Sequence, residues 1–398
     1  MKKLFAIFVL IWSIISACSD SEVETVEPRE VFKITWSSDY NFPEEVWVIV
    51  KADESAELLG QNWVKKGESF SFVSDKIVPS DKLAITIIKK AATSSVYVDV
   101  FLGIDLGTVW TLENTAPVPT EQATTLGNYD LEIFYIPGFT MYSVSDKFGS
   151  TASSVSSSTS SFRGKFRVNE NAEQLIVTDG TGLSGPTYKK IQPNVDDNIV
   201  IDNASFSDFD KYLNLTFPSN EVKVSLRASN ANTSGFIMYE QTSPAKTQTS
   251  LSLGFLNSFP TYKLNLQIGR LFEYRSNGPA PTSIPYVDNT GLNVSASTLT
   301  NFKVDGTRDF SYRISTYYTN VLDFFVVYHG EPGAIHHDPF TPETLTKFQL
   351  DGSRLNYIRT GFVVNGQTYD QYLDSRFKSG FDQNSSYQIT TVYDKYFF

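Results

Sequence analysis

The 398-residue sequence predicts a mainly β protein, and three observations support this. It contains 30 Phe and 21 Tyr but only three Met, together with many Ser, Thr, Asn and Val residues, a composition that favours strands over helices. Short segments with apolar residues at every second position recur along the chain and are separated by turn residues. At roughly 150 residues per domain, the length allows two or three domains. We therefore expect two or three β-sandwich-like domains in tandem.

The first predicted domain covers residues 31–113. Its alternating segments include Phe32–Trp36, Ser69–Phe72 and Val96–Val100, and an apolar run at Val46–Val50 alternates more weakly. Turn residues such as Lys66-Gly67 separate these segments. Short strands at intervals of roughly 10–15 residues are typical of a β-sandwich.

A linker and a second domain are predicted next. Residues 114–125 (NTAPVPTEQATT) contain two prolines and no aromatic residue, which is typical of a linker. The second β domain, residues 126–218, opens with the alternating segment Tyr129–Ile136. It contains a serine-rich stretch, residues 143–161, that we expect to form a loop or an edge hairpin. The turn residues Pro218-Ser219-Asn220 predict its end.

The third predicted domain, residues 219–398, is a β domain that holds most of the tyrosines and two short helices. Thr341-Pro342 predicts a helix start, with a threonine cap and proline at the first helical position. Thr368 and Gln371 have the spacing of a capping box, which predicts a second helix.

The chain is acidic, with a formal net charge of −11. Such a surface repels phosphate backbones, so we expect no nucleic-acid partner.

The first eighteen residues form a leader pattern. Lys2 and Lys3 precede the apolar run Leu4–Ile15, which is too short to span a bilayer, and Ser16-Ala17-Cys18 follows with the only cysteine of the chain. This pattern resembles the lipobox of bacterial lipoproteins, which are cleaved before the cysteine and acylated on it. The resemblance implies a signal peptide at residues 1–17, lipidation of Cys18 with acyl chains such as palmitate, and membrane attachment through them. The alternative is an unlipidated secretory peptide cut after Ala17.

Residues 18–30 form an acidic tether after the leader. Ser19-Asp20-Ser21-Glu22 resembles the export signal that places lipoproteins of Bacteroidota on the cell surface, and the organisation of the whole chain resembles uncharacterised multi-domain surface lipoproteins of that group. The resemblance implies a lipid anchor in the outer membrane and exposure at the cell surface, with a periplasm-facing protein as the alternative.

All three histidines lie within nine residues and share their loop with two carboxylates: His329, Glu331, His336, His337 and Asp338. Imidazole and carboxylate groups brought together could hold a divalent metal such as Zn²⁺. The simpler interpretation is a set of polar loop residues without metal. A metal site would favour a metal-assisted hydrolase; apart from this metal the sequence indicates no cofactor, and we assign no catalytic residue.

Trp63 is the best candidate for an exposed ligand-binding aromatic residue, because its neighbours (GQNWVKKGE) are typical of an exposed turn. Tryptophan in a small sandwich more often fills the core. With no catalytic motif present, we expect a non-catalytic envelope lipoprotein that binds a glycan or a protein, or acts as an accessory subunit at the outer membrane.

Overall fold

The computed structural model describes residues 27–38, 44–90, 95–113, 123–135, 140–149, 153–156, 161–170, 173–178, 185–229, 235–319, 324–378 and 386–395. Most of these residues lie in strands, which confirms the predicted mainly β fold. The predicted signal peptide, Cys18 and most of the acidic tether lie outside the described residues. Within the described residues, no helix has the length and hydrophobicity that spanning a membrane requires.

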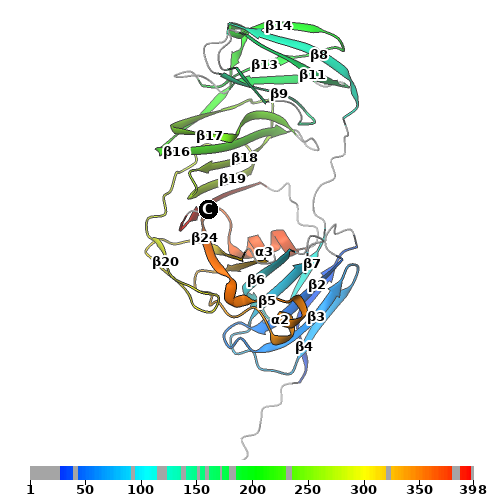
Figure 1. The fold of residues 1–398 in the computed structure, drawn as a ribbon, viewed down its shortest axis with the longest axis vertical. Coiled ribbons are helices and arrows are strands. Elements are labelled where there is room, and N and C mark those ends of the chain that lie inside the picture. The colour runs from blue at the N-terminus through cyan, green and yellow to red at the C-terminus, as the bar shows by residue number, and fades with distance from the viewer. Residues whose placement is uncertain are drawn as a thin grey trace, which may run out of the picture.

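A twelve-stranded sheet forms the centre of the molecule, with the order β17-β16-β18-β19-β25-β24-β22-β23-β6-β5-β2-β3 (Figure 1). Its first four strands in the chain come from the N-terminal region, and the other eight follow residue 210. Their bounds are β2 Glu45–Ala52, β3 Leu58–Lys65, β5 Lys82–Lys90, β6 Val96–Asp105, β16 Lys211–Ser229, β17 Phe236–Phe255, β18 Thr261–Ile268, β19 Phe272–Gly278, β22 Tyr312–Thr319, β23 Phe324–Gly330, β24 Asn356–Asn365 and β25 Tyr387–Tyr393.

The N-terminal and C-terminal parts of this sheet join through one parallel pair, β6 with β23, in which Val96 lies opposite Phe324. Residues 31–113 and 219–398, predicted as separate domains, therefore contribute strands to the same sheet. A second sheet, ordered β4-β1-β7, packs on the N-terminal strands and completes a sandwich around a large apolar cluster. Its strands are β1 Arg29–Trp36, β4 Ser69–Ser74 and β7 Thr108–Leu112.

Residues 125–208 form a separate sandwich at the other end of the elongated molecule (Figure 1). One sheet has the order β10-β9-β12-β13-β15 and the other β11-β8-β14, with an apolar core between them. The bounds are β8 Thr125–Phe134, β9 Thr140–Asp146, β10 Ser153–Ser156, β11 Ser161–Asn169, β12 Gln174–Thr178, β13 Thr187–Ile191, β14 Asn198–Asp202 and β15 Ser207–Asp208. Within the serine-rich stretch, β10 is an edge strand of the first sheet.

The chain does not break at Pro218, where the sequence predicts the end of a domain. β16 continues through this residue, and its pairing with β17 shifts register between Thr216 and Asn220. Proline cannot donate to a strand ladder and is tolerated at such a bulge. The turn residues therefore mark an irregularity inside a strand.

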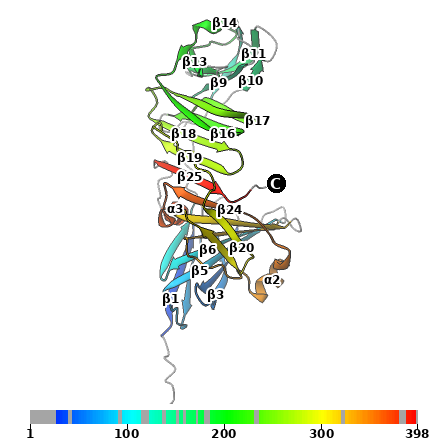
Figure 2. The same cartoon turned by 90° about the vertical axis from the view of Figure 1, so that its left-hand side faces the viewer.

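Two α-helices cover opposite faces of the central sheet (Figure 2). α2, Pro342–Phe348, begins at the predicted cap Thr341 and packs on one apolar cluster through Phe348. α3, Tyr369–Phe377, begins with the predicted Thr368–Gln371 capping box and packs on the cluster of the opposite face. A small hairpin, β20 Leu292–Ser297 and β21 Phe302–Gly306, lies beside the sheet.

Candidate ligand pocket

His329 is a buried structural residue at the end of β23. Its Nε2 lies 3.2 Å from Asp99 Oδ1, and its Nδ1 lies 2.8 Å from the Tyr372 hydroxyl of α3. Burial lowers the pKa of His329, so the ring is neutral at pH 7. Because the ionised Asp99 can only accept, we assign the proton to Nε2, and Tyr372 then donates to Nδ1.

The other two histidines lie in separate environments. His336 is 2% exposed and stacks on Tyr328, with 4.0 Å between ring centroids. His337 Nε2 faces Asp53, with 3.8 Å to its Oδ1. Burial lowers the pKa of both rings, that of His336 far below its usual value.

The carboxylates of the histidine loop do not join the imidazoles. Glu331 is exposed, and Asp338 Oδ1 accepts from the Phe340 backbone N–H at 3.0 Å. Among the described residues, no group of three or more His, Cys, Asp or Glu side chains is arranged to hold a metal ion. The structure therefore does not bring the five predicted metal ligands together, because His329 on β23 and His336 and His337 on the following loop each face a different neighbour.

Trp63 lies on β3 beneath α2 and does not form an open platform. Its ring contacts Trp47 at 5.3 Å and Phe348 at 5.6 Å between centroids, and the Lys347 ammonium lies 5.3 Å from it. The indole is thus half-buried against the apolar cluster around Trp47. The structure favours the core interpretation of this residue.

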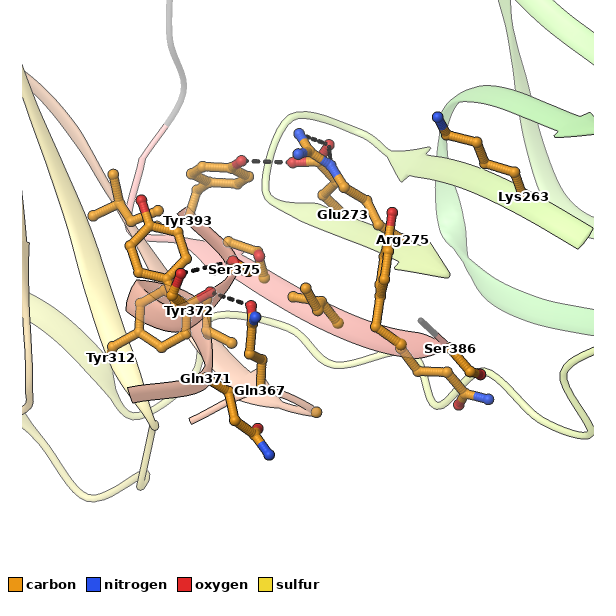
Figure 3. Close-up of a pocket in the computed structure, with 18 of the residues that line it drawn as sticks. Lys263, Glu273, Arg275, Tyr312, Gln367, Gln371, Tyr372, Ser375, Ser386 and Tyr393 are labelled. Atoms are coloured by element: carbon orange, nitrogen blue, oxygen red, sulfur yellow. Dashed lines mark hydrogen bonds and ion pairs between the residues drawn. The ribbon is translucent and has the colours of Figure 1, made fainter. Parts of the chain in front are cut away.

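A cavity of about 830 Å³ lies instead over β18, β19, β25, β24 and β22, with α3 forming one wall (Figure 3). The strands contribute alternate residues to it, so that one face of the sheet forms the floor. Along β25 these are Tyr387, Ile389, Thr391 and Tyr393, and Gln388 also lines the pocket, whereas Thr390 and Val392 are buried on the other face. The floor is therefore the solvent side of strands whose other side is core.

A connected row of polar groups crosses this floor. The Glu273 carboxylate accepts from Arg275 Nε at 2.7 Å and from the Tyr393 hydroxyl at 2.7 Å (Figure 3). The Arg359 guanidinium lies 4.0 Å from the centroid of the Tyr393 ring. Burial and the nearby Glu273 raise the pKa of Tyr393, so the phenol stays protonated and donates. Gly361 makes room for this ring, since a Cβ there would lie 3.0 Å from a Tyr393 ring carbon.

Tyrosine rings and amides form the other end of the pocket. The rings of Tyr312 and Tyr372 stack with 4.8 Å between centroids, and Tyr312 donates to Gln367 Oε1 at 3.2 Å. Gln371 of α3 joins this wall, and Lys263 lies at the opposite end of the pocket (Figure 3). Planar amides and aromatic faces therefore meet cationic groups across one cavity.

The histidine network holds the wall in place. α3 is tied to β23 by the Tyr372–His329 bond and by the Tyr369 hydroxyl, which donates to the His329 carbonyl at 2.9 Å. The same network reaches β6, because His329 pairs with Asp99. Although burial by itself would raise the pKa of Asp99, Lys89 and His329 hold it below its usual range. His329 thus positions the pocket wall and does not line the pocket.

A strip of aromatic rings continues from the pocket along the same face. Tyr318 lies two residues beyond the pocket-lining Thr316 on β22 and is 4.6 Å from Phe325 on β23. Phe325 in turn stacks on Tyr97 of β6 at 5.4 Å, with 5° between the ring planes. Tyr97 is 43% exposed. We refer to Tyr97, Phe325 and Tyr318 as the aromatic strip.

None of the pocket-lining residues was among the site residues predicted from the sequence. A signal was present, since Tyr387, Ile389, Thr391 and Tyr393 alternate with Gln388, Thr390 and Val392 along one strand. The signal gave no position in space, because the other strands of the floor are distant in sequence. A scan against protein-family models found no match, and a search of the curated proteins found no significant one.

Proposed function

We propose that this protein is a non-catalytic lipoprotein of the cell envelope that binds a saccharide in the pocket of the central sheet. The observation that carries the proposal is the pocket itself, a concave surface of about 830 Å³ lined by tyrosine rings and planar polar side chains. Sites on proteins that bind small molecules are concave and typically about 300–1,000 Å³ in volume.

The lining suits a sugar better than an apolar ligand. A sugar ring carries hydroxyl groups around its edge, which amides and guanidinium groups such as those of Gln367, Gln371 and Arg275 can bind. Its C–H faces can pack on aromatic rings, and the half-buried Tyr387 and Tyr393 line the pocket. The aromatic strip offers further ring faces beside the pocket.

Binding is tested with a glycan array followed by calorimetry, using the mature chain with Cys18→Ala. Thr391→Trp places a large side chain on the pocket floor and should abolish binding, because Thr391 lines the cavity. Thr216→Trp is the matched control, since Thr216 is an exposed strand residue outside the pocket. Absence of any saccharide ligand, or equal binding by both variants, would contradict the proposal.

The proposed location of the protein at the outer membrane follows from the leader sequence. Acylation of Cys18 would anchor the protein in the outer membrane, because each buried CH₂ contributes about 0.8 kcal/mol and lipoproteins carry more than one chain. Cys18→Ala should then abolish incorporation of a fatty-acid probe. Equal labelling of the variant would exclude acylation at this residue.

We further propose the outer face of that membrane, with the periplasmic side as the alternative. Protease added to intact cells should then degrade the protein. Alanine at both Asp20 and Glu22 should protect it if these acids form the export signal. Protection of both proteins would place the pocket in the periplasm.

A further inference from the structure

The pocket is cationic although the chain is acidic. Among the described residues, its lining contains three cationic side chains, Lys263, Arg275 and Arg359, and one carboxylate, Glu273. The whole chain has 44 acidic and 33 basic residues. A local excess of positive charge in a recess produces a stronger electrostatic potential than the same charges on a flat surface, because low-dielectric walls focus the field.

The carboxylate is already engaged by its neighbours. Arg275 contacts Glu273 Oε1 through both Nε and Nη2, at 2.7 and 2.6 Å, and Tyr393 donates to Oε2. Glu273 therefore offsets about one of the three positive charges. Lys263, at one end of the row, is not in contact with this carboxylate.

Lys263 is the cation most open to a ligand. It is exposed on β18, and within the described chain no hydrogen bond or ion pair engages its ammonium group. Its register partner on β16 is Arg227, so a second cation follows directly outside the pocket. Towards the sheet edge, the described strands β16 and β17 carry the carboxylates Glu221 and Glu240 on this side.

We infer that the ligand is an anionic saccharide, with acid groups on its sugar rings. This inference rests on the proposed function and specifies its ligand class. Guanidinium groups bind carboxylate and sulfate through paired N–H donors, and an ammonium group adds a point charge.

The experiment compares three ligand sets of equal length by calorimetry at low salt: oligogalacturonides, sulfated galactan oligomers and neutral galactan oligomers. We expect at least one acidic set to bind more tightly than the neutral set, with an affinity that falls as salt is added. Preference for the carboxylated or the sulfated set identifies the acid group.

Lys263→Gln should weaken binding of the acidic set by about two- to fivefold, as expected for one exposed charge, and Lys263→Glu should weaken it further. Lys165→Gln is the control, because Lys165 is an exposed lysine on β11 of the distant sandwich. Neutral oligomers should bind both glutamine variants equally.

Two outcomes would overturn the inference, and only the second would also overturn the proposed function. If neutral oligomers bind as tightly as acidic ones and Thr391→Trp blocks them, the pocket binds sugars but the charge preference is wrong. If none of the three sets and no array glycan binds, the proposed function falls as well.

Discussion

The two ends of the central sheet are built differently. β2 and β5 of the N-terminal end are buried on both faces. On β2, for example, Val48 lies in one apolar cluster and the next residue, Ile49, lies in another. β18 and β19 are buried on one face only, and their other face carries polar residues such as Lys263 and Arg275. One sheet therefore serves as core at one end and as a binding surface at the other.

This difference follows from which layers cover the sheet. At the N-terminal end, the β4-β1-β7 sheet covers one face, and α2 packs on the cluster of the other face. Over β18, β19 and β25 the polar face has no such layer among the described residues, and the pocket lies there. The two ends belong to one sheet because β6 pairs with β23.

The largest effect that this comparison predicts concerns stability. Trp47→Ala should lower the free energy of unfolding by about 3–5 kcal/mol, because Trp47 is 4% exposed and packs between Trp63 and Lys347. Thr391→Ala on the pocket floor should change it by less than about 0.5 kcal/mol. Urea unfolding of both variants provides the measurement. Similar losses would show that the two ends of the sheet are equally dependent on packing.

Features set by residues close in sequence were predicted correctly, whereas contacts between residues distant in sequence were not predicted. The Thr368–Gln371 capping box and the Thr341 cap depend on residues within one turn, and the structure confirms both. The β6–β23 pair joins residues more than 200 positions apart, which no periodicity indicates. The pocket was not predicted for the same reason, because its floor combines strands that are distant in sequence, from residues 263 to 393.

Sequence proximity was also misleading in the histidine loop. His336 and His337 are adjacent, but one ring stacks on Tyr328 and the other faces Asp53. Neighbouring side chains in an extended segment point to opposite sides. Clustering in sequence therefore did not indicate a cluster in space.

An intermediate effect is expected from pH. Burial lowers the pKa of His329 and His336 in the folded protein, whereas in the unfolded chain these rings titrate near ~6.5. Below that pH the unfolded state binds protons that the folded state does not, so the free energy of unfolding should fall as the pH decreases. Each buried ring contributes at most about 1.4 kcal/mol per pH unit. Urea unfolding at pH 7, 6 and 5 measures the slope.

Two variants test the origin of this slope. His336→Phe keeps the stacking on Tyr328 and Phe302 and should reduce the slope by about one proton. Asp53 acts in the opposite sense, because burial raises its pKa to about 6, so that the folded state binds a proton between pH ~4 and 6. Asp53→Asn should therefore steepen the fall below pH 6. Unchanged slopes in both variants would assign the pH dependence to other groups.

The smallest effect concerns the aromatic strip, which lies where the core end and the open end of the sheet meet. Tyr97 is on β6 of the core end, yet its ring stacks on Phe325 on the same face as the pocket. A saccharide long enough to leave the pocket past Thr316 would next meet Tyr318 and Phe325, and Tyr97 beyond them. Loss of one stacking ring is worth roughly 0.5–1.5 kcal/mol, or about two- to tenfold in the dissociation constant. Tyr97→Ala should therefore weaken the binding of long oligosaccharides by that factor and leave short ones unaffected.

Calorimetry with a ligand series of increasing length measures this, with Tyr135→Ala as the control, because Tyr135 is 71% exposed on the distant sandwich. Equal weakening at every length would mean that Tyr97 acts through the fold, and no weakening at any length would confine the ligand to the pocket.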